Sequence, residues 1–170
     1  MNEDRIVHEF GTSRENEERR DGGAAVVFDP GTNLFAVARE RDTLRLRLFS
    51  GGVEQNEDMQ EGILREVEEE GGLYDFDRVI YLDEVLAHYH NSLKNVNRVA
   101  YATCFLVILR STATKPQRLE EHEPFDLVWV SEKQLRANWD EWNTEHGLDH
   151  WVYFLDRACG QLQEMGFTEL

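Results

Sequence analysis

Residues 51–73 read GGVEQNEDMQEGILREVEEEGGL, and this stretch decides the fold. The part from Asp58 to Glu70 is rich in good helix formers, and the glycine pair after it is a typical helix stop. Three apolar side chains fall on one side of such a helix, about 110° around from its carboxylates; they are Ile63, Leu64 and Val67. The pattern predicts a helix that buries one side and presents acidic residues at its rim.

Three carboxylates share one face of this predicted helix. Glu66, Glu69 and Glu70 are related as i, i+3 and i+4, so their side chains are neighbours. Like charges at this spacing cost about 0.2–0.5 kcal/mol per pair, and a purely structural helix would gain from spreading them out. A divalent cation reverses the sign of that cost, and Mg²⁺ is held by carboxylate oxygens. By itself, an acidic run is usually a solvated helix face, and a divalent metal site is the alternative that this spacing suits.

The glycine pair that opens the stretch fits the same interpretation. Glycines let backbone carbonyls and amides approach a metal or a phosphate closely. Glu57 in the loop and Arg65 on the helix are oppositely charged, and a salt bridge between them would tie the loop to the helix. The loop and the helix together would then form a cradle for a diphosphate and its metal.

Length and charge narrow the class of protein. The chain has 170 residues, of which 41% are apolar, and this suits one domain with a buried core. Acidic residues outnumber basic ones by 34 to 18, a net charge of −16. This balance excludes a general coat for DNA or RNA, because phosphate backbones are held by Lys and Arg. Small phosphorylated ligands that arrive with a divalent metal are not excluded.

Cysteine use and hydropathy suggest a cytoplasmic location. Cys104 and Cys159 have no partner motif for zinc or for nucleophilic catalysis. The longest apolar run, from Cys104 to Leu109, is far too short to cross a membrane. The acidic N-terminus lacks the features of a secretory signal. We expect a cytoplasmic protein that does not associate with membranes.

The rest of the chain predicts one mixed α/β domain over residues 1–170. Residues 1–23 form a polar N-terminal arm with a short strand around Ile6–Phe10. A polar loop is expected from His88 to Asn95. Strands are expected at 24–28, 34–39, 44–49, 79–87, 96–109 and 126–130, and helices at 132–138 and at the C-terminal segment 146–166.

The central stretch resembles a known family signature. From Gly51 to Leu73 it reads G-x5-E-x7-R-E-U-x-E-E-x-G-U, where U is apolar. This is similar to the Nudix box, and every defined position is filled. The resemblance implies an α/β/α sandwich with a mixed β-sheet and a central catalytic loop-helix. It also implies hydrolysis of a nucleoside diphosphate linked to another group, with Mg²⁺ or Mn²⁺ as cofactor.

The resemblance also assigns roles to individual residues. Glu66, Glu69 and Glu70 match the metal-binding glutamates, and a backbone carbonyl at Gly51 or Ser50 completes the metal shell. Arg65 matches the structural ion-pair partner of Glu57. Many family members add an acidic residue from a later loop, and Glu123 in the segment E-x-x-D-x-x-W is the choice here, with Glu120 and Glu121 as alternatives. In the family the general base is a box or a loop residue, so Glu69 and Glu123 are the candidates for it.

The substrate is only partly indicated. Asn56 stands where the family usually has Gly, and Ser50 where Pro is common, so the loop geometry differs from the usual pattern. Tyr89 lies 16 residues beyond the box, which resembles the subgroup that acts on dinucleoside polyphosphates. We therefore expect a nucleoside triphosphate or a dinucleoside polyphosphate as the small substrate, with no polymeric nucleic acid as partner. Homodimerisation stays open.

Several alternatives remain at this point. His88, Tyr89 and His90 could contact the substrate or be half-buried loop residues. A group of arginines could supply a phosphate contact or line a solvent-facing strand: Arg39, Arg41, Arg45 and Arg47. The alternative function is a catalytically silent Nudix-fold module that binds or senses a nucleotide, but such modules usually lose box glutamates. An isoprenoid isomerase on the same fold would need a paired Cys and Glu, for which Cys104 is a weak candidate.

Overall fold

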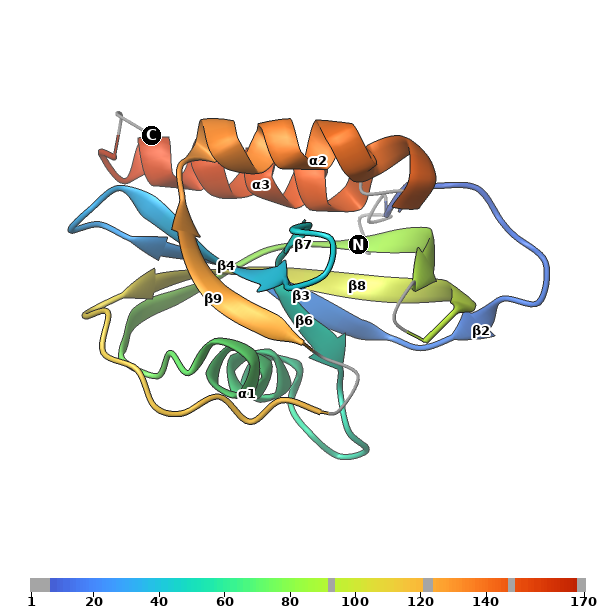
Figure 1. Cartoon of the computed structure of the whole chain (residues 1–170), viewed down its shortest axis with the longest axis horizontal. Coiled ribbons are helices and arrows are strands. Elements are labelled where there is room, and N and C mark those ends of the chain that lie inside the picture. Colours follow the sequence, from blue (N-terminus) through green and yellow to red (C-terminus); the bar gives the residue numbers. More distant parts are fainter. Residues whose placement is uncertain (1–6, 92–93, 121–123, 147–148, 168–170) are drawn as a thin grey trace, which may run out of the picture.

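The computed structural model describes residues 7–91, 94–120, 124–146 and 149–167, except for the side chains of residues 143–146. Within these ranges it has a mixed sheet, with α1 on one face and α2 and α3 on the other (Figure 1). This is the predicted α/β/α arrangement. The elements in chain order are β1 (His8–Phe10), β2 (Glu18–Arg19), β3 (Gly22–Asp29), β4 (Leu34–Glu40), β5 (Leu46–Arg47), β6 (Phe49–Gly52), α1 (Met59–Gly71), β7 (Phe76–Asn91), β8 (Val96–Leu109), β9 (Phe125–Val130), α2 (Glu132–His146) and α3 (Asp149–Glu164).

The sheet combines parallel and antiparallel pairs. Its main path is β1-β7-β8-β3-β4-β5, and β2, β6 and β9 pair with β8, β3 and β4. β3 runs parallel to β8 and antiparallel to β4 and β6. This places β6, which ends at Gly52, beside the start of β3, so that Gly51 pairs with Gly23. The glycines of the box therefore lie directly against the centre of the sheet.

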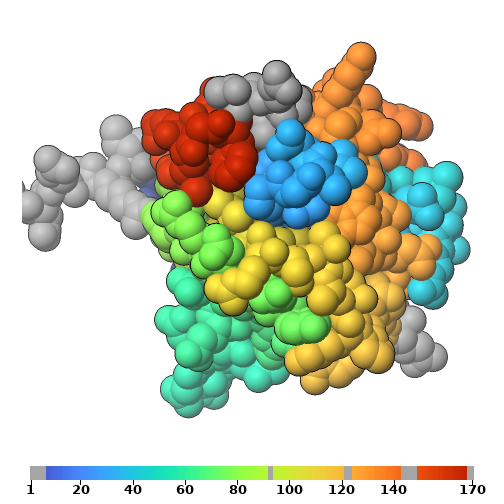
Figure 2. All heavy atoms as spheres, turned by 90° about the vertical axis from the view of Figure 1, so that its left-hand side faces the viewer, coloured from blue at the N-terminus to red at the C-terminus, as the bar shows by residue number. Residues whose placement is uncertain are grey.

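The central strand β3 separates two apolar cores. Ala24, Val26 and Phe28 pack on the side of α2 and α3, and Ala25 and Val27 pack on the side of α1. A strand covered on both faces reads as a continuous apolar run rather than an alternating one. In Figure 2 the end of α3 (red) lies beside the turn after β3 (blue).

Helix α1 begins and ends at the residues that the sequence indicates. Asp58 caps the N-terminus, where its Oδ2 accepts a hydrogen bond from the backbone N–H of Glu61 at 3.2 Å. Gly72 ends the helix in the left-handed region, with φ 72°, where glycine carries no Cβ penalty. The buried side of α1 carries Ile63 and Val67, as predicted, and also Glu70.

Helix α2 begins with a reciprocal cap and is longer than predicted. The Gln134 N–H donates to Ser131 Oγ at 3.1 Å, and the Ser131 N–H donates to Gln134 Oε1 at 2.9 Å, which satisfies two terminal donors. The helix continues to His146, beyond the predicted end at Asn138. Its second half is mostly polar, so the apolar periodicity there is weak. The last helix, α3, spans Asp149–Glu164 within the predicted segment 146–166.

Two strand predictions need correction. Residues 44–49 do not form one strand, because β5 pairs with β4 and β6 pairs with β3. The chain therefore changes its partner strand at Leu48, a tertiary effect that alternation along the sequence does not reveal. The predicted loop 88–95 is wrong in its first part, because β7 continues to Asn91 and pairs with β8.

The N-terminal arm is attached to the sheet at two points. β1 pairs parallel with β7 at residues 85–87, and β2 pairs parallel with β8 at Arg98 and Val99. The predicted short strand around Ile6–Phe10 corresponds to β1. Among the described residues, no helix is long and apolar enough to cross a membrane. Cys104 and Cys159 are both free and buried.

Candidate active site

The predicted ion pair between the loop and α1 is present. Arg65 donates to Glu57 through two nitrogens, with Nε–Oε2 and Nη2–Oε1 distances of 2.9 and 3.0 Å. Glu57 also accepts a bond from the backbone N–H of Glu54 at 3.1 Å. The hydrogen bond from Arg65 is the main cause that lowers the pKa of Glu57. This two-pronged, charge-assisted contact fixes the loop against the helix.

The same guanidinium also contacts two carboxylates of α1. Arg65 Nη1 lies 3.1 Å from Glu66 Oε1 and 3.1 Å from Glu69 Oε2. The pKa of Arg65 is raised above its usual value, first by its hydrogen bond with Glu57. The expectation that the three glutamates repel one another unless a metal is bound therefore needs correction. Arg65 offsets the repulsion between Glu66 and Glu69.

Glu70 is held by the backbone of β6. Its Oε1 accepts a hydrogen bond from the Ser50 N–H at 2.9 Å, and Glu70 is only 3% exposed. A proline at position 50, which is common in the Nudix pattern, would lack this donor. Serine at this position therefore adds a contact between the sheet and the helix that proline could not provide.

Glycine at position 51 leaves room for the carboxylate of Glu66. An ideal Cβ on Gly51 would lie 2.5 Å from Cδ and Oε1 of Glu66, so any side chain would displace that carboxylate. Asn56 takes a left-handed conformation, with φ 66°. This explains how Asn replaces the usual glycine, because Asn tolerates this region better than most residues.

Two of the three box glutamates are among the described residues that line a pocket, and the third is not. Glu66 and Glu70 line a pocket together with Ser50 and Gly51, whereas Glu69 is directed to Arg65 and is not among the described lining residues. Within the described ranges, no group of three or more His, Cys, Asp or Glu side chains forms a ready metal cluster. Mg²⁺ is commonly held by one or two carboxylates plus water and substrate phosphates. The pair Glu66 and Glu70, with the close backbone at Gly51, fits that requirement.

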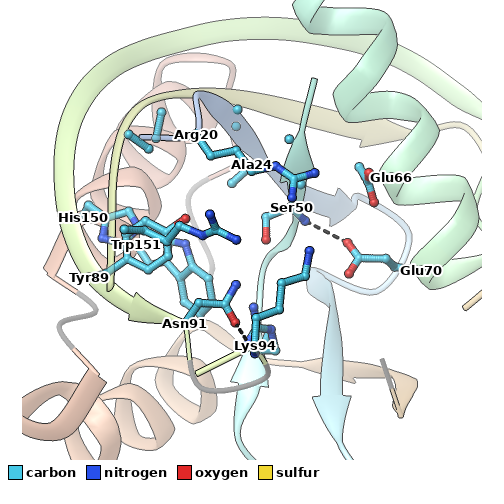
Figure 3. Close-up of a pocket in the computed structure, with 18 of the residues that line it drawn as sticks. Arg20, Ala24, Ser50, Glu66, Glu70, Tyr89, Asn91, Lys94, His150 and Trp151 are labelled. Carbon is cyan, nitrogen blue, oxygen red and sulfur yellow. Dashed lines mark hydrogen bonds between the residues drawn. The ribbon is translucent and has the colours of Figure 1, made fainter. Parts of the chain in front are cut away.

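The pocket has an acidic end and a basic, aromatic end. In Figure 3, Glu66 and Glu70 lie on one side of Ser50, and Tyr89, His150 and Trp151 lie on the other. Five basic side chains also line it: Arg20, Arg45, Arg47, Lys94 and Arg98. Three glutamates are among the described lining residues, namely Glu66, Glu70 and Glu120. The acidic end suits a cation, and the basic end suits an anion.

The interpretation of Arg45 and Arg47 as solvent-facing is wrong. Arg45 is 3% exposed, and both side chains form ion pairs with Glu40, at 3.4 and 3.3 Å. Arg47 also lies over the ring of Trp151, with its Cζ 5.5 Å from the ring centroid. Trp151 belongs to α3, and the alternation of Arg and Leu along the chain does not reveal this distant contact.

Of the other candidate residues, some line the pocket and others do not. Tyr89 and His90 line the pocket, whereas His88 binds Glu9 and Glu17 of the N-terminal arm instead. Arg41 forms an ion pair with Asp126 at 3.0 Å, and neither it nor Arg39 is among the described lining residues. Glu120, an alternative for the additional acid, lines the pocket. Glu123, the preferred choice, and Glu121 lie outside the described residues.

Some lining residues were not predicted from the sequence. Arg20 belongs to the N-terminal arm, Lys94 and Arg98 to the β7–β8 region, and His150 and Trp151 to the start of α3. Their only sequence signal is residue type, since they lie far from the box in the chain. Cys104 is not among the described lining residues, and burial raises its pKa. This removes the basis for the isomerase alternative.

The fold and the site define an α/β domain with a carboxylate-bearing loop-helix beside a basic pocket. The sequence model described as the NUDIX domain matches residues 18–152. The chain therefore belongs to the Nudix family, as its complete box predicted. It is a Nudix hydrolase, an enzyme of the class that acts on phosphoanhydrides.

Solved structures share this fold at low sequence identity. A pyrophosphohydrolase from Bacillus subtilis aligns with TM-score 0.60 and 18% identity, over 93% of this chain and 90% of its own. An ADP compounds hydrolase aligns with TM-score 0.59 and 15% identity, over 90% and 78%. A NUDIX hydrolase from Nitrosomonas europaea gives TM-score 0.51 and 18% identity, over 72% and 79%. The search of curated proteins returned no match.

Proposed function

We propose that this protein hydrolyses a phosphoanhydride bond in a nucleoside diphosphate linked to another group, and that it depends on Mg²⁺ or Mn²⁺. The observation that carries this proposal is the pocket that joins Glu66 and Glu70 to five basic side chains. A phosphoanhydride substrate with a divalent metal has the complementary charges. The substrate we propose is a nucleoside triphosphate or a dinucleoside polyphosphate.

The metal would be held at the acidic end of the pocket. Glu66 and Glu70 would provide carboxylate oxygens, with a backbone carbonyl at Gly51 and with Glu69 as a further candidate. When bound, the metal supplies charge neutralisation on the phosphoryl oxygens and a lowered pKa of coordinated water. Arg65 keeps Glu66 and Glu69 in place through its shared Nη1. Its contact with Glu57 keeps the loop rigid.

The chain's own residues would then position the substrate and accept a proton. Basic side chains at the other end of the pocket orient the phosphate groups. A water oxygen attacks one phosphorus in line, the new P–O bond forms, and the anhydride P–O bond breaks. A carboxylate oxygen of Glu69 or of Glu123 takes the proton of the water. We propose the catalytic set Arg65, Glu66, Glu69, Glu70 and Glu123.

Other properties belong to the same proposal. The substrate is a small molecule rather than a polymeric nucleic acid, because a net charge of −16 opposes extended phosphate backbones. The two free thiols, Cys104 and Cys159, support a reducing compartment such as the cytoplasm. Burial raises the pKa of Cys159 to about 12, so it is not a reactive nucleophile at neutral pH.

A substrate panel tests the proposed function. It contains nucleoside triphosphates, dinucleoside polyphosphates, ADP-ribose, nucleotide sugars and coenzyme A, each with Mg²⁺, with Mn²⁺ and with chelator. One structural relative is named an ADP compounds hydrolase and another a pyrophosphohydrolase, and adenosine compounds come first because of the former. We expect metal-dependent release of phosphate, pyrophosphate or mononucleotide. Tight nucleotide binding without turnover of any compound would instead support the silent sensor.

A further inference from the structure

The basic side chains of the pocket are of two kinds. Three of them form ion pairs with glutamates that are not among the described lining residues: Arg45 and Arg47 with Glu40, and Arg98 with Glu18 at 2.7 Å. Arg20 and Lys94 form no ion pair among the described residues, although the chain carries an excess of carboxylates. Because both are exposed at the pocket, their charges are available to a ligand.

Arg20 is placed at the pocket by the N-terminal arm. Its backbone N–H donates to the Val99 carbonyl at 3.0 Å, which extends the pairing of β2 with β8. An ideal Cβ on Gly52 would lie 2.4 Å from Nε and 2.9 Å from Nη2 of Arg20. The guanidinium therefore lies against the second glycine of the box, in the space that a side chain there would fill.

Lys94 approaches from a different element. It follows β7 in the connection to β8, and its backbone N–H donates to Asn91 Oδ1 at 3.1 Å. In Figure 3, Lys94 extends into the pocket from one side and Arg20 from the opposite side, with Ser50 between them. Both lie in the same pocket as Glu66 and Glu70. Two cations thus face the region next to the proposed metal end.

We infer that Arg20 and Lys94 bind a phosphate group of the substrate beyond the two phosphates joined at the cleaved bond. This inference rests on the proposed function and names the two residues that would favour substrates with three or more linked phosphates over substrates with only two. Two carboxylates and one Mg²⁺ carry no net charge, so the negative charge of the substrate must be balanced by basic side chains of the pocket. A third phosphate adds negative charge that Arg20 and Lys94 can pair with, whereas a neutral sugar adds none.

ATP and ADP-ribose form the decisive pair of substrates. Both contain adenosine diphosphate, and they differ in whether a phosphate or a ribose is attached to it. In Arg20→Gln and in Lys94→Gln, we expect KM for ATP to rise about tenfold, as for loss of one charge-assisted contact. We expect KM for ADP-ribose to rise less than KM for ATP, by less than about twofold.

Arg19→Gln and Lys133→Gln are matched controls, since each removes the same charge elsewhere. Arg19 pairs with Asp21 and lies over the Tyr101 ring at 5.0 Å, and Lys133 is exposed on α2. Neither is among the described lining residues, so neither should change the ratio of the two KM values. A loss that is equal for ATP and ADP-ribose, or as large in the controls, would overturn the inference.

Binding separates this inference from the proposed function. The probe is an ATP analogue with methylene groups in place of the bridging oxygens, titrated by calorimetry at fixed Mg²⁺. We expect wild type to bind it about tenfold more tightly than Arg20→Gln does, whether or not any compound is hydrolysed. Equal affinity would overturn the phosphate site. If Arg20→Gln binds the analogue more weakly and wild type hydrolyses no compound, the phosphate site is supported and the proposed hydrolysis is rejected.

Discussion

The backbone N–H of Ser50 donates a 2.9 Å hydrogen bond to Oε1 of Glu70. This contact joins β6 to α1 at the rim of the pocket and fixes one carboxylate without neutralising its charge. Each carboxylate oxygen can accept more than one bond, so this contact does not prevent Glu70 from binding a metal. Glu70 can therefore serve the fold and the proposed metal site together.

The exchange of Glu70 for Gln tests this double role. Glu70→Gln keeps the side-chain oxygen that accepts the Ser50 N–H and removes only the charge. We expect normal folding and a fall in hydrolysis of about a hundredfold or more, because even an indirect disturbance of a metal site costs about 10–100-fold. Circular dichroism and initial rates at saturating Mg²⁺ measure the two effects.

Glu68→Gln is the control for this variant. Glu68 lies on the same helix and forms an ion pair with Lys115 at 3.4 Å, but it does not line the pocket among the described residues. Removal of the Glu68 charge should leave the rate of hydrolysis almost unchanged. Wild-type turnover in Glu70→Gln would remove Glu70 from the proposed site.

Removal of Arg65 should reduce stability and activity together. Arg65→Ala would leave the carboxylates of Glu57, Glu66 and Glu69 without their shared donor, at a cost of about 1–3 kcal/mol in the free energy of unfolding. Urea titration at pH 7 and initial rates give the two readouts. Normal stability with reduced activity would instead indicate that Arg65 contacts the substrate directly.

The pH dependence of the same pair has a definite sign. The Arg65 hydrogen bond lowers the pKa of Glu57 in the folded state. The stabilisation is therefore present above the unfolded pKa and is lost as the pH falls through the folded pKa. Stability should decrease in acid more steeply in wild type than in Arg65→Ala. If both proteins lose stability equally as the pH falls, the pairing of Arg65 with Glu57 is contradicted.

The local parts of the site could be predicted from the sequence. The spacing along α1 gives the buried side, and the opposite charges of Glu57 and Arg65 fall within one loop-helix unit. The cap at Asp58 and the stop at Gly72 depend on side chains next to the helix ends. Such features require no knowledge of the rest of the chain.

The other half of the pocket depends on contacts that are distant in sequence. Arg20 reaches it because β2 pairs with β8, and Trp151 reaches it because α3 crosses the same face of the sheet. Arg45 is buried with its partner Glu40 and lies over the ring of Trp151, at 6.0 Å from the centroid. No local periodicity contains this information.

Divalent metal should stabilise wild type more than Glu66→Gln. Arg65 and the Ser50 N–H already contact the glutamates, so the gain comes from metal binding to the folded arrangement. Linkage gives about 1.4 kcal/mol at a metal concentration ten times Kd, or a rise in Tm of about 3–6 °C for a domain of this size. Thermal melts with MgCl₂ and MnCl₂ measure it.

A monovalent salt at matched ionic strength is the control for this melt. Screening of the net charge of −16 should help wild type and Glu66→Gln almost equally. Coordination should favour wild type alone. An equal rise in Tm with NaCl and MgCl₂ would mean that the carboxylates of α1 form a solvated acidic face.

The attachment of the N-terminal arm should weaken as the pH rises. His88 Nδ1 lies 2.7 Å from Glu17 Oε2, and its Nε2 lies 2.8 Å from Glu9 Oε1. A neutral imidazole donates from one nitrogen only, so two such bonds to carboxylates require the protonated ring. The contact with Glu17 is the main cause that raises the pKa of His88, and burial opposes it.

A raised pKa fixes the direction of the effect on stability. The contribution of His88 is complete below its unfolded pKa of about 6.5 and is lost as the pH rises through its higher folded value. Between pH 6 and 9, the free energy of unfolding should fall further in wild type than in His88→Gln. His90→Gln is the matched control, because His90 Nδ1 contacts Asn97 Oδ1 rather than a carboxylate.

Urea titrations at each pH measure the free energy of unfolding of the three proteins. Proteolysis of residues 7–17 should accelerate over the same pH range in wild type. If wild type and His88→Gln lose stability in parallel, the ring is not protonated between the two glutamates, and another group must hold the arm.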